Sequence, residues 1–204
     1  LAASYPMRWI DFIVNRSSIG KLLELNSCND ISEIINRTVE LDLPIEDRMF
    51  ALLFRCVDDY DQMEKWIKKF NLSAALHFPS SMIKFILMAR KHYDIIPTIN
   101  TDSDMRRFIV KMQGTTFSNK IIKLYRAINN ANVSDLNTLS HNNENTIISI
   151  DELAINGNEL MEIYNITGKQ IGTLKRNIFE CILNGNIVNE KNAIINYINS
   201  SKLL

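Results

Sequence analysis

Apolar residues recur at helical spacing along most of the chain, beginning most clearly between residues 44 and 57. Five apolar positions there follow the spacing i, i+3, i+4, i+7 and i+8: Met49, Leu52, Leu53, Cys56 and Val57. The stretch opens with Pro44 and the acids Glu46 and Asp47, which favour the first turn of a helix. Together these features predict an amphipathic helix.

The same period continues on both sides of this stretch. It is carried by the following residues: Ile31, Ile34 and Ile35; Tyr60, Met63, Ile67 and Phe70; Met82, Ile83, Ile86 and Leu87. A helix pair is predicted at 102–113 and 116–130, with Thr101 or Asp102 as cap and Gly114 as stop. Trp9, Ile13 and Val14 predict further helix upstream, whereas only the short run 145–150 alternates as a strand does. The pattern predicts an all-α fold.

The most polar and least periodic stretch is "NNANVSDLNTLSHNNEN" at 129–145, which is typical of a linker or long loop. We therefore predict a boundary near residue 140. A multi-helical body, 1–140, precedes it, and a small helical tail module, 141–204, follows it.

Four of the six glycines lie in this tail, at positions 157, 168, 172 and 185. We assign Gly157 and Gly185 ordinary structural roles, Gly185 as a helix stop. Gly168 falls where a turn between two short helices requires positive φ, and Lys169 then begins a helix whose first amides lack internal partners. Such a helix start attracts anions, and Gly172 leaves room for a backbone, of RNA or of a packed helix, to approach.

Charge is distributed unevenly, although the net charge is zero. Residues 62–130 hold 12 Lys or Arg against 4 Asp or Glu, a net +8, while the flanking parts are −5 and −3. A polyanion-binding surface would show this distribution, and so would lysine-rich solvated helix faces. In the tail, Lys175 and Arg176 add to Lys169, and no acid lies between Ile163 and Phe179.

Catalytic and metal-binding motifs are missing from the sequence. The three histidines are isolated, the three cysteines form no CxxC pair, and neither GxxxxGK[ST] nor GxGxxG occurs. Asp102 and Asp104 are better explained as helix-capping residues than as a pair of metal ligands. We expect reduced thiols, a cytoplasmic protein without a membrane span, and, because Leu1 is not methionine, a piece cut from a longer chain.

The tail contains "L-x-I-x-G-x-x-L" from Leu153, then "G-x-x-I-G" from Gly168 and "G-x-I-x-N" from Gly185. In this order and spacing it resembles the C-terminal tail region of bacterial CCA-adding tRNA nucleotidyltransferases, relatives of the poly(A) polymerases. Weaker similarity extends through the body in the following segments: "PIEDRMFALLF", "FNLS", "DMRRFI" and "IIKLYRA". Two mild departures are Glu159 where the family often has Asp, and Thr167 where it often has Pro.

The resemblance implies a tRNA-binding body and tail for tRNA 3′-end processing, with a helix-hairpin-helix-like turn in the tail. The body would lie along the acceptor and T stems, and the tail would reach the elbow. The nucleotide-adding head has no counterpart in this sequence, so magnesium and CTP or ATP would belong to that head, and whether the chain acts as an enzyme stays open. The implied phosphate-binding residues are Gly168, Lys169, Gly172, Lys175, Arg176, Arg106, Arg107 and Lys111.

Two alternatives remain at this point. One is a helical protein-interaction or dimerisation module whose basic face meets an acidic partner. The other is the appendage of a different polymerase or nuclease that shares only the tail. The patterns make no prediction of oligomeric state.

Overall fold

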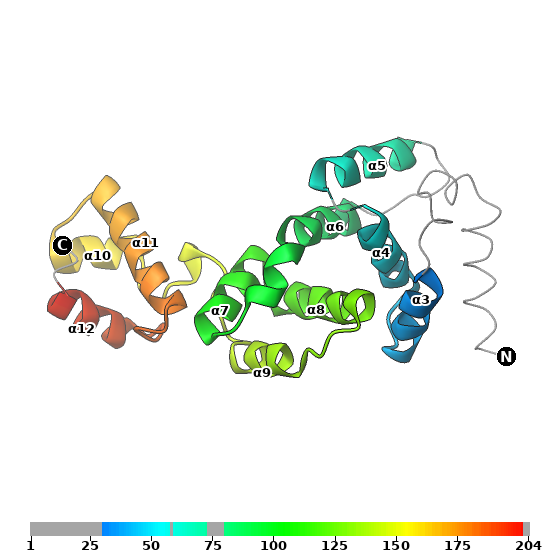
Figure 1. Ribbon diagram of the computed structural model, residues 1–204. Helices are drawn as coiled ribbons and strands as arrows, with labels where there is room; N and C mark the ends of the chain where they lie inside the picture. The colour runs from blue at the N-terminus through cyan, green and yellow to red at the C-terminus, as the bar shows by residue number, and fades with distance from the viewer. Residues whose placement is uncertain (1–29, 58, 73–79, 202–204) are drawn as a thin grey trace. The chain divides into compact units, whose positions relative to one another are not determined.

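The computed structural model describes residues 30–57, 59–72 and 80–201, and these form helices joined by short connections (Figure 1). No strand occurs among the described residues, the run 145–150 included, which confirms the predicted all-α fold. The helices predicted around Trp9 and Ile13 lie outside the described residues.

The chain packs as two compact units that interleave along the sequence. The first comprises the described residues up to Ile96 together with Lys120–Val133, and the second comprises Pro97–Asn119 with the described residues from Ser134. The boundary predicted at residue 140 separates an RNA-binding body from a tail, which is a different kind of division from these two units. That boundary stays a prediction.

The described part of the first unit contains four whole helices and part of a fifth. They are α3 (Ile31–Glu40), α4 (Ile45–Cys56), α5 (Tyr60–Leu72), α6 (Ser80–His92) and residues 120–129 of α8 (Thr115–Asn129). The 3-10 helix η3 (Tyr93–Thr98) follows α6. Leu52 and Leu53 of α4 and the adjacent Val57 are buried, as are Met63 and Ile67 of α5, which confirms these positions of the predicted apolar faces. Tyr60, also predicted on the apolar face of α5, is exposed.

Two ion pairs of the first unit each have one buried member, and the cation of each also contacts aromatic rings. Lys120 pairs with the buried Asp47 at 2.6 Å, and its ammonium lies 4.7 Å from the ring centre of Phe85. The buried Arg90 pairs with Asp94 at 3.0 Å and lies 5.2 Å from the ring centre of Tyr93. These contacts supply the charge partners that the buried Asp47 and Arg90 require.

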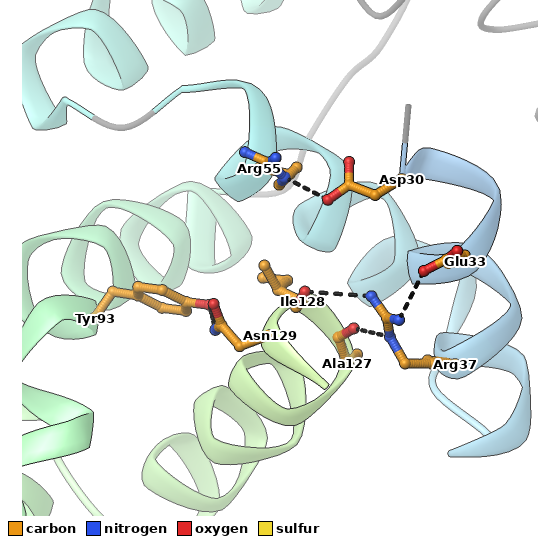
Figure 2. A network of polar contacts seen from close by, with 8 residues as sticks. All are labelled: Asp30, Glu33, Arg37, Arg55, Tyr93, Ala127, Ile128 and Asn129. Carbon is orange, nitrogen blue, oxygen red and sulfur yellow. Dashed lines mark hydrogen bonds and ion pairs between the residues drawn. The ribbon is translucent and has the colours of Figure 1, made fainter. Parts of the chain in front are cut away.

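A third polar group holds the C-terminal end of α8 (Figure 2). Arg37 of α3 donates from Nε to the Ala127 carbonyl at 2.6 Å and from Nη2 to the Ile128 carbonyl at 3.3 Å. Asn129 donates to the Tyr93 hydroxyl at 2.6 Å, and burial raises the pKa of Tyr93. The last turn of α8, whose carbonyls lack helical partners, is thereby fixed to α3 and η3.

The second unit begins with α7 (Asp102–Lys111), which has well-defined signals at both ends. Thr101 accepts a hydrogen bond from the amide of Asp104, and the Asp104 carboxylate accepts one from the amide of Thr101, forming a capping box. At the other end Gln113 has φ +57° and Gly114 φ +127°, and the Gly114 amide donates to the Ile109 carbonyl. The predicted cap at Thr101 and stop at Gly114 are confirmed, with the first left-handed residue being Gln113.

The C-terminal helices share one apolar core. They are α10 (Gly157–Tyr164), α11 (Lys169–Leu183) and α12 (Lys191–Ser201), preceded by the 3-10 helix η4 (Ile150–Glu152). Ile155, Leu160, Ile178 and Ile194 are at most 1% exposed within this cluster. A β-carbon at Gly157 would lie 3.3 Å from Cγ2 of Ile171, so this glycine serves close packing of α10 on α11, the ordinary structural role predicted for it.

The prediction of a linker or long loop at 129–145 is wrong, because Ser134–Asn142 forms the helix α9. The buried side chains of Ser140, in this helix, and of Asn143, just beyond it, are both polar. Ser140 donates a hydrogen bond to Asn119, and Asn143 donates one to Asp102. Satisfied polar groups thus occupy positions where apolar residues usually mark a buried helix face. A search for apolar periodicity therefore overlooks this helix.

The capping box of α7 predicts a pH-dependent contribution to stability. Hydrogen bonds from the Thr101 side chain and from backbone amides hold the pKa of Asp104 below its ordinary value of 3.8. Ionised Asp104 therefore stabilises the fold above that pH, and the contribution is lost as pH falls through the lowered pKa. We expect Asp104→Asn to lower the free energy of unfolding by about 1 kcal/mol at neutral pH.

Urea denaturation of parent and variant between about pH 7 and pH 2 measures this difference, which should disappear in strong acid. Glu162→Gln is the control, since Glu162 is exposed and makes no hydrogen bond or ion pair with the described residues. A difference between parent and Asp104→Asn that persists unchanged at pH 2 would contradict the prediction.

Candidate nucleic-acid interface

The eight residues predicted to bind phosphate all belong to the second unit, where they form two separate groups. One group surrounds the start of α11, and the other lies on α7. Arg107 of α7 pairs with Glu180 at 2.8 Å, so α7 meets the C-terminal half of α11. Eleven residues of helix separate Lys169 from Glu180, about 16 Å along the axis. The sequence-predicted residues therefore do not converge on one point.

Gly168 forms the turn that begins α11. It has φ +50° and ψ −114°, a conformation that favours glycine and confirms the predicted positive φ. No side chain caps the helix and no acid occurs in its first turn. Residues 167–170 are exposed. The start of α11, with the positive end of its dipole, is therefore exposed, although the Gln170 amide already donates to the Thr167 carbonyl at 3.1 Å.

Gly172 lies one turn into α11 and is also exposed. A β-carbon at this position would meet no described atom within 4 Å. Packing among the described residues therefore does not require a glycine at this position. The missing side chain leaves space beside the first turn of the helix.

The three cations near this turn differ in their contacts. Lys175 is largely buried and lies 3.7 Å from the Asp151 carboxylate. Arg176 donates to the carbonyl of Gly172 and to the Thr173 hydroxyl on its own helix. Lys169 is exposed and makes no hydrogen bond or ion pair with the described residues. Of the three, Lys169 alone makes no hydrogen bond or ion pair with the described residues, and it is therefore the least committed to contacts within the protein.

Arg106 joins three segments of the second unit. Its Nε donates to the carbonyl of Leu183, the last residue of α11, at 2.8 Å, and its Nη1 donates to Oδ1 of Asn143 at 2.8 Å. The Asn143 amide in turn donates to Asp102 at 2.6 Å and to the Leu139 carbonyl at 2.8 Å. This network connects α7, the end of α9 and the end of α11.

Gly185 completes the same arrangement. It has φ +77°, its amide donates to the Ile182 carbonyl, and the Asn186 amide donates to the Cys181 carbonyl, which confirms the predicted helix stop. A β-carbon at Gly185 would lie 2.8 Å from Nη2 of Arg106. The glycine therefore also makes room for the guanidinium.

Arg107 and Lys111 share α7 with Arg106 but have different surroundings. Arg107 donates to Glu180 and to Asn184, both at 2.8 Å, whereas Lys111 is exposed and unpartnered among the described residues. Arg106 and Arg107 are both engaged in bonds within the second unit, although each guanidinium keeps N–H groups that these bonds do not use. Their role as phosphate ligands stays a prediction, and it is one that alanine substitution cannot isolate from stability.

The acids of α7 do not fit a magnesium site, because Asp104 closes the capping box and Asp102 accepts from Asn143. In the described ranges, no group of three or more His, Cys, Asp or Glu side chains is placed to hold a metal ion. Within the same ranges, no helix is long and apolar enough to cross a membrane. We therefore derive no metal-dependent step from these residues.

The Arg106 network gives a direct stability prediction. Arg106→Ala leaves the Leu183 carbonyl and the Asn143 amide oxygen without their donor, so we expect the free energy of unfolding to fall by about 2 kcal/mol. Arg106→Lys should recover only part of this loss, because an ammonium lacks the planar fork that reaches both acceptors. Lys111→Ala, the control on the same helix, should change stability by less than about 0.5 kcal/mol in urea denaturation. Equal stability of Arg106→Ala and Lys111→Ala would show that the network contributes nothing.

One family model matches the chain, over residues 42–198, and it is described as tRNA nucleotidyltransferase domain 2, putative. No curated protein and no solved structure gave a significant match. The matched range covers 157 of the 204 residues and includes α4 to α11, most of α12 and both groups of candidate residues. The chain therefore belongs to the family of tRNA nucleotidyltransferase domain 2.

Proposed function

We propose that this chain is the tRNA-binding body and tail of a CCA-adding tRNA nucleotidyltransferase, and that it holds tRNA by its sugar-phosphate backbone during 3′-end processing. The observation that carries the proposal is the family match over residues 42–198. Recognition of folded RNA depends largely on its shape and its phosphates. A helical protein with exposed amides and cations suits that kind of recognition.

In this proposal the chain positions tRNA, and a head domain performs the chemistry. Magnesium and CTP or ATP would bind to that head, whose carboxylates have no counterpart among the residues described above. The reaction would take place in the cytoplasm. The three cysteines, which form no CxxC pair, agree with a reducing compartment.

The start of α11 is the phosphate contact that we propose for the second unit. Its first turn has neither an acid nor a side-chain cap, and Lys169 beside it is exposed and unpartnered among the described residues. The space beside Gly172 allows a phosphate to approach the first amides closely. Backbone amides and one cation are sufficient to hold a phosphate at a helix N-terminus.

Discrimination between RNAs tests the proposed function. The chain should bind a folded tRNA at least tenfold more tightly than an unstructured RNA of equal length, because shape places several phosphates at once. Fluorescence anisotropy at two or more salt concentrations measures both affinities. Equal affinities would indicate general electrostatic attraction, and absence of binding to either RNA would favour the protein-interaction alternative.

A single substitution tests the start of α11. Gly172→Glu places a negative side chain beside the proposed phosphate, so tRNA binding should weaken by about tenfold or more. Stability should be kept, because the site has open space and glutamate favours helix over glycine by roughly 0.5 kcal/mol or more.

Gly172→Ala is the matched control, since it adds a β-carbon without charge; it separates the effect of bulk from that of charge, and it should weaken tRNA binding much less than Gly172→Glu does. Circular dichroism of both variants checks the helical content. If Gly172→Glu remains folded and binds tRNA as the parent does, no phosphate lies at this turn. If it unfolds the second unit, the glycine serves packing after all.

A further inference from the structure

Helix α8 carries basic side chains and no acidic ones, as does α6 in the same unit. The fifteen residues of α8, "TTFSNKIIKLYRAIN", include three cations and no carboxylate. Lys120 is the inward-facing cation that pairs with Asp47. Lys123 and Arg126 are exposed, and neither makes a hydrogen bond or ion pair with any described residue. The charge distribution of the sequence indicates a basic region at residues 62–130, but Lys123 and Arg126 are not among the phosphate-binding residues predicted from it.

Several other described cations of the first unit are already engaged. Arg37 bonds carbonyls at the end of α8, Arg55 pairs with Asp30 at 2.8 Å, and Arg48 donates to the Leu43 carbonyl at 2.8 Å. Lys68 pairs with Glu64 at 2.8 Å on α5. Lys123 and Arg126 differ from these, because binding an external anion would break no contact within the described structure. Lys65, Lys84 and Lys91 are exposed and, like Lys123 and Arg126, make no hydrogen bond or ion pair with the described residues, but no two of these three lie within one turn of each other.

The two side chains lie three residues apart, so they emerge from one face of α8 with their β-carbons about 5–6 Å apart. Like charges at this spacing repel by a few tenths of a kcal/mol in an isolated helix, and no carboxylate of α8 offsets the repulsion. Packing within the protein does not explain the pair, whereas an external polyanion would neutralise both charges.

The helix beneath these residues is held firmly. Ile121, Ile122, Leu124 and Ala127 of α8 have no exposed surface, so its opposite face is packed in the core. Arg37 and Asn129 fix its last turn, as Figure 2 shows. The exposed face is therefore a preformed surface, and binding to it orders little beyond the two side chains.

The composition of this face decides between possible polyanions. Within the first unit, the exposed positions of α8 are Lys123, Arg126 and Asn129, all polar or cationic. A protein partner is usually bound through aromatic or aliphatic anchors, and a peripheral membrane helix inserts such residues. Amides and cations without apolar residues are typical of contacts to sugar and phosphate.

We propose that Lys123 and Arg126 of α8 form a docking surface for the sugar-phosphate backbone of RNA in the first unit. This inference rests on the proposed tRNA binding and adds a contact surface to it, in a unit that holds none of the phosphate-binding residues predicted from the sequence. It also separates two kinds of arginine: Arg106 and Arg37 bond helix carbonyls, whereas Arg126 is directed to the ligand.

The double variant Lys123→Gln, Arg126→Gln tests the surface in the full chain with the same tRNA. Each lost phosphate contact lowers the slope of log affinity against log salt by about one, so the slope should fall by about two. Affinity near 0.1 M salt should drop on the order of tenfold or more. Glutamine preserves helix propensity, so urea denaturation should be unchanged.

The matched control is Lys65→Gln, Lys68→Gln on α5. It removes the same charge from the same unit, but from a helix that also carries Asp61 and Glu64. This variant should bind within about twofold of the parent and keep its salt slope. Equal losses in the two double variants would indicate general charge attraction and overturn the assignment to α8.

The outcomes separate this inference from the proposed function. If the parent binds tRNA with the expected preference and the α8 variant binds equally well, the surface on α8 is not used. If the parent itself does not bind tRNA, the proposed function fails first, and the α8 surface for RNA fails with it.

Discussion

The carbonyl groups at the ends of helices set the main requirement of this fold. A helix leaves its last carbonyls without helical partners, and an all-helical protein has many such ends. Arginines from other helices supply donors at the two longest described helices: Arg37 at the end of α8 and Arg106 at the end of α11. A guanidinium suits this position because its positive charge also complements the negative end of the helix dipole.

Because some arginines bond distant parts of the protein, only part of the candidate interface could be predicted from the sequence. The positive φ of Gly168 follows from local turn chemistry, and the structure has it. The roles of Arg106 and Arg107 depend on Leu183 and Glu180, more than seventy residues away in the chain. Nothing in "DMRRFI" distinguishes an arginine that faces phosphate from one that faces a distant carbonyl. Lys123 and Arg126 could be proposed as RNA-binding residues only after the structure had shown which cations already have partners within the protein.

The fold itself was predictable where apolar residues mark the buried face. The helices α4 and α5 follow their apolar period, and α7 follows the cap at Thr101. The prediction was wrong for α9, where Ser140 and the adjacent Asn143 are buried and hydrogen-bonded. Side-chain hydrogen bonds between distant segments leave no periodic signal, so a polar helix of this kind looks like a loop in the sequence.

The close approach of Arg106 to Gly185 ties the identities of two positions together. A β-carbon at 185 would occupy the place of the Arg106 guanidinium, and the positive φ at 185 already disfavours other residues. A relative with a larger residue at 185 would therefore need a different turn after α11, and an arginine at 106 would have to move its guanidinium aside. We expect these two positions to change together during divergence, as a correlated pair separated by 79 residues.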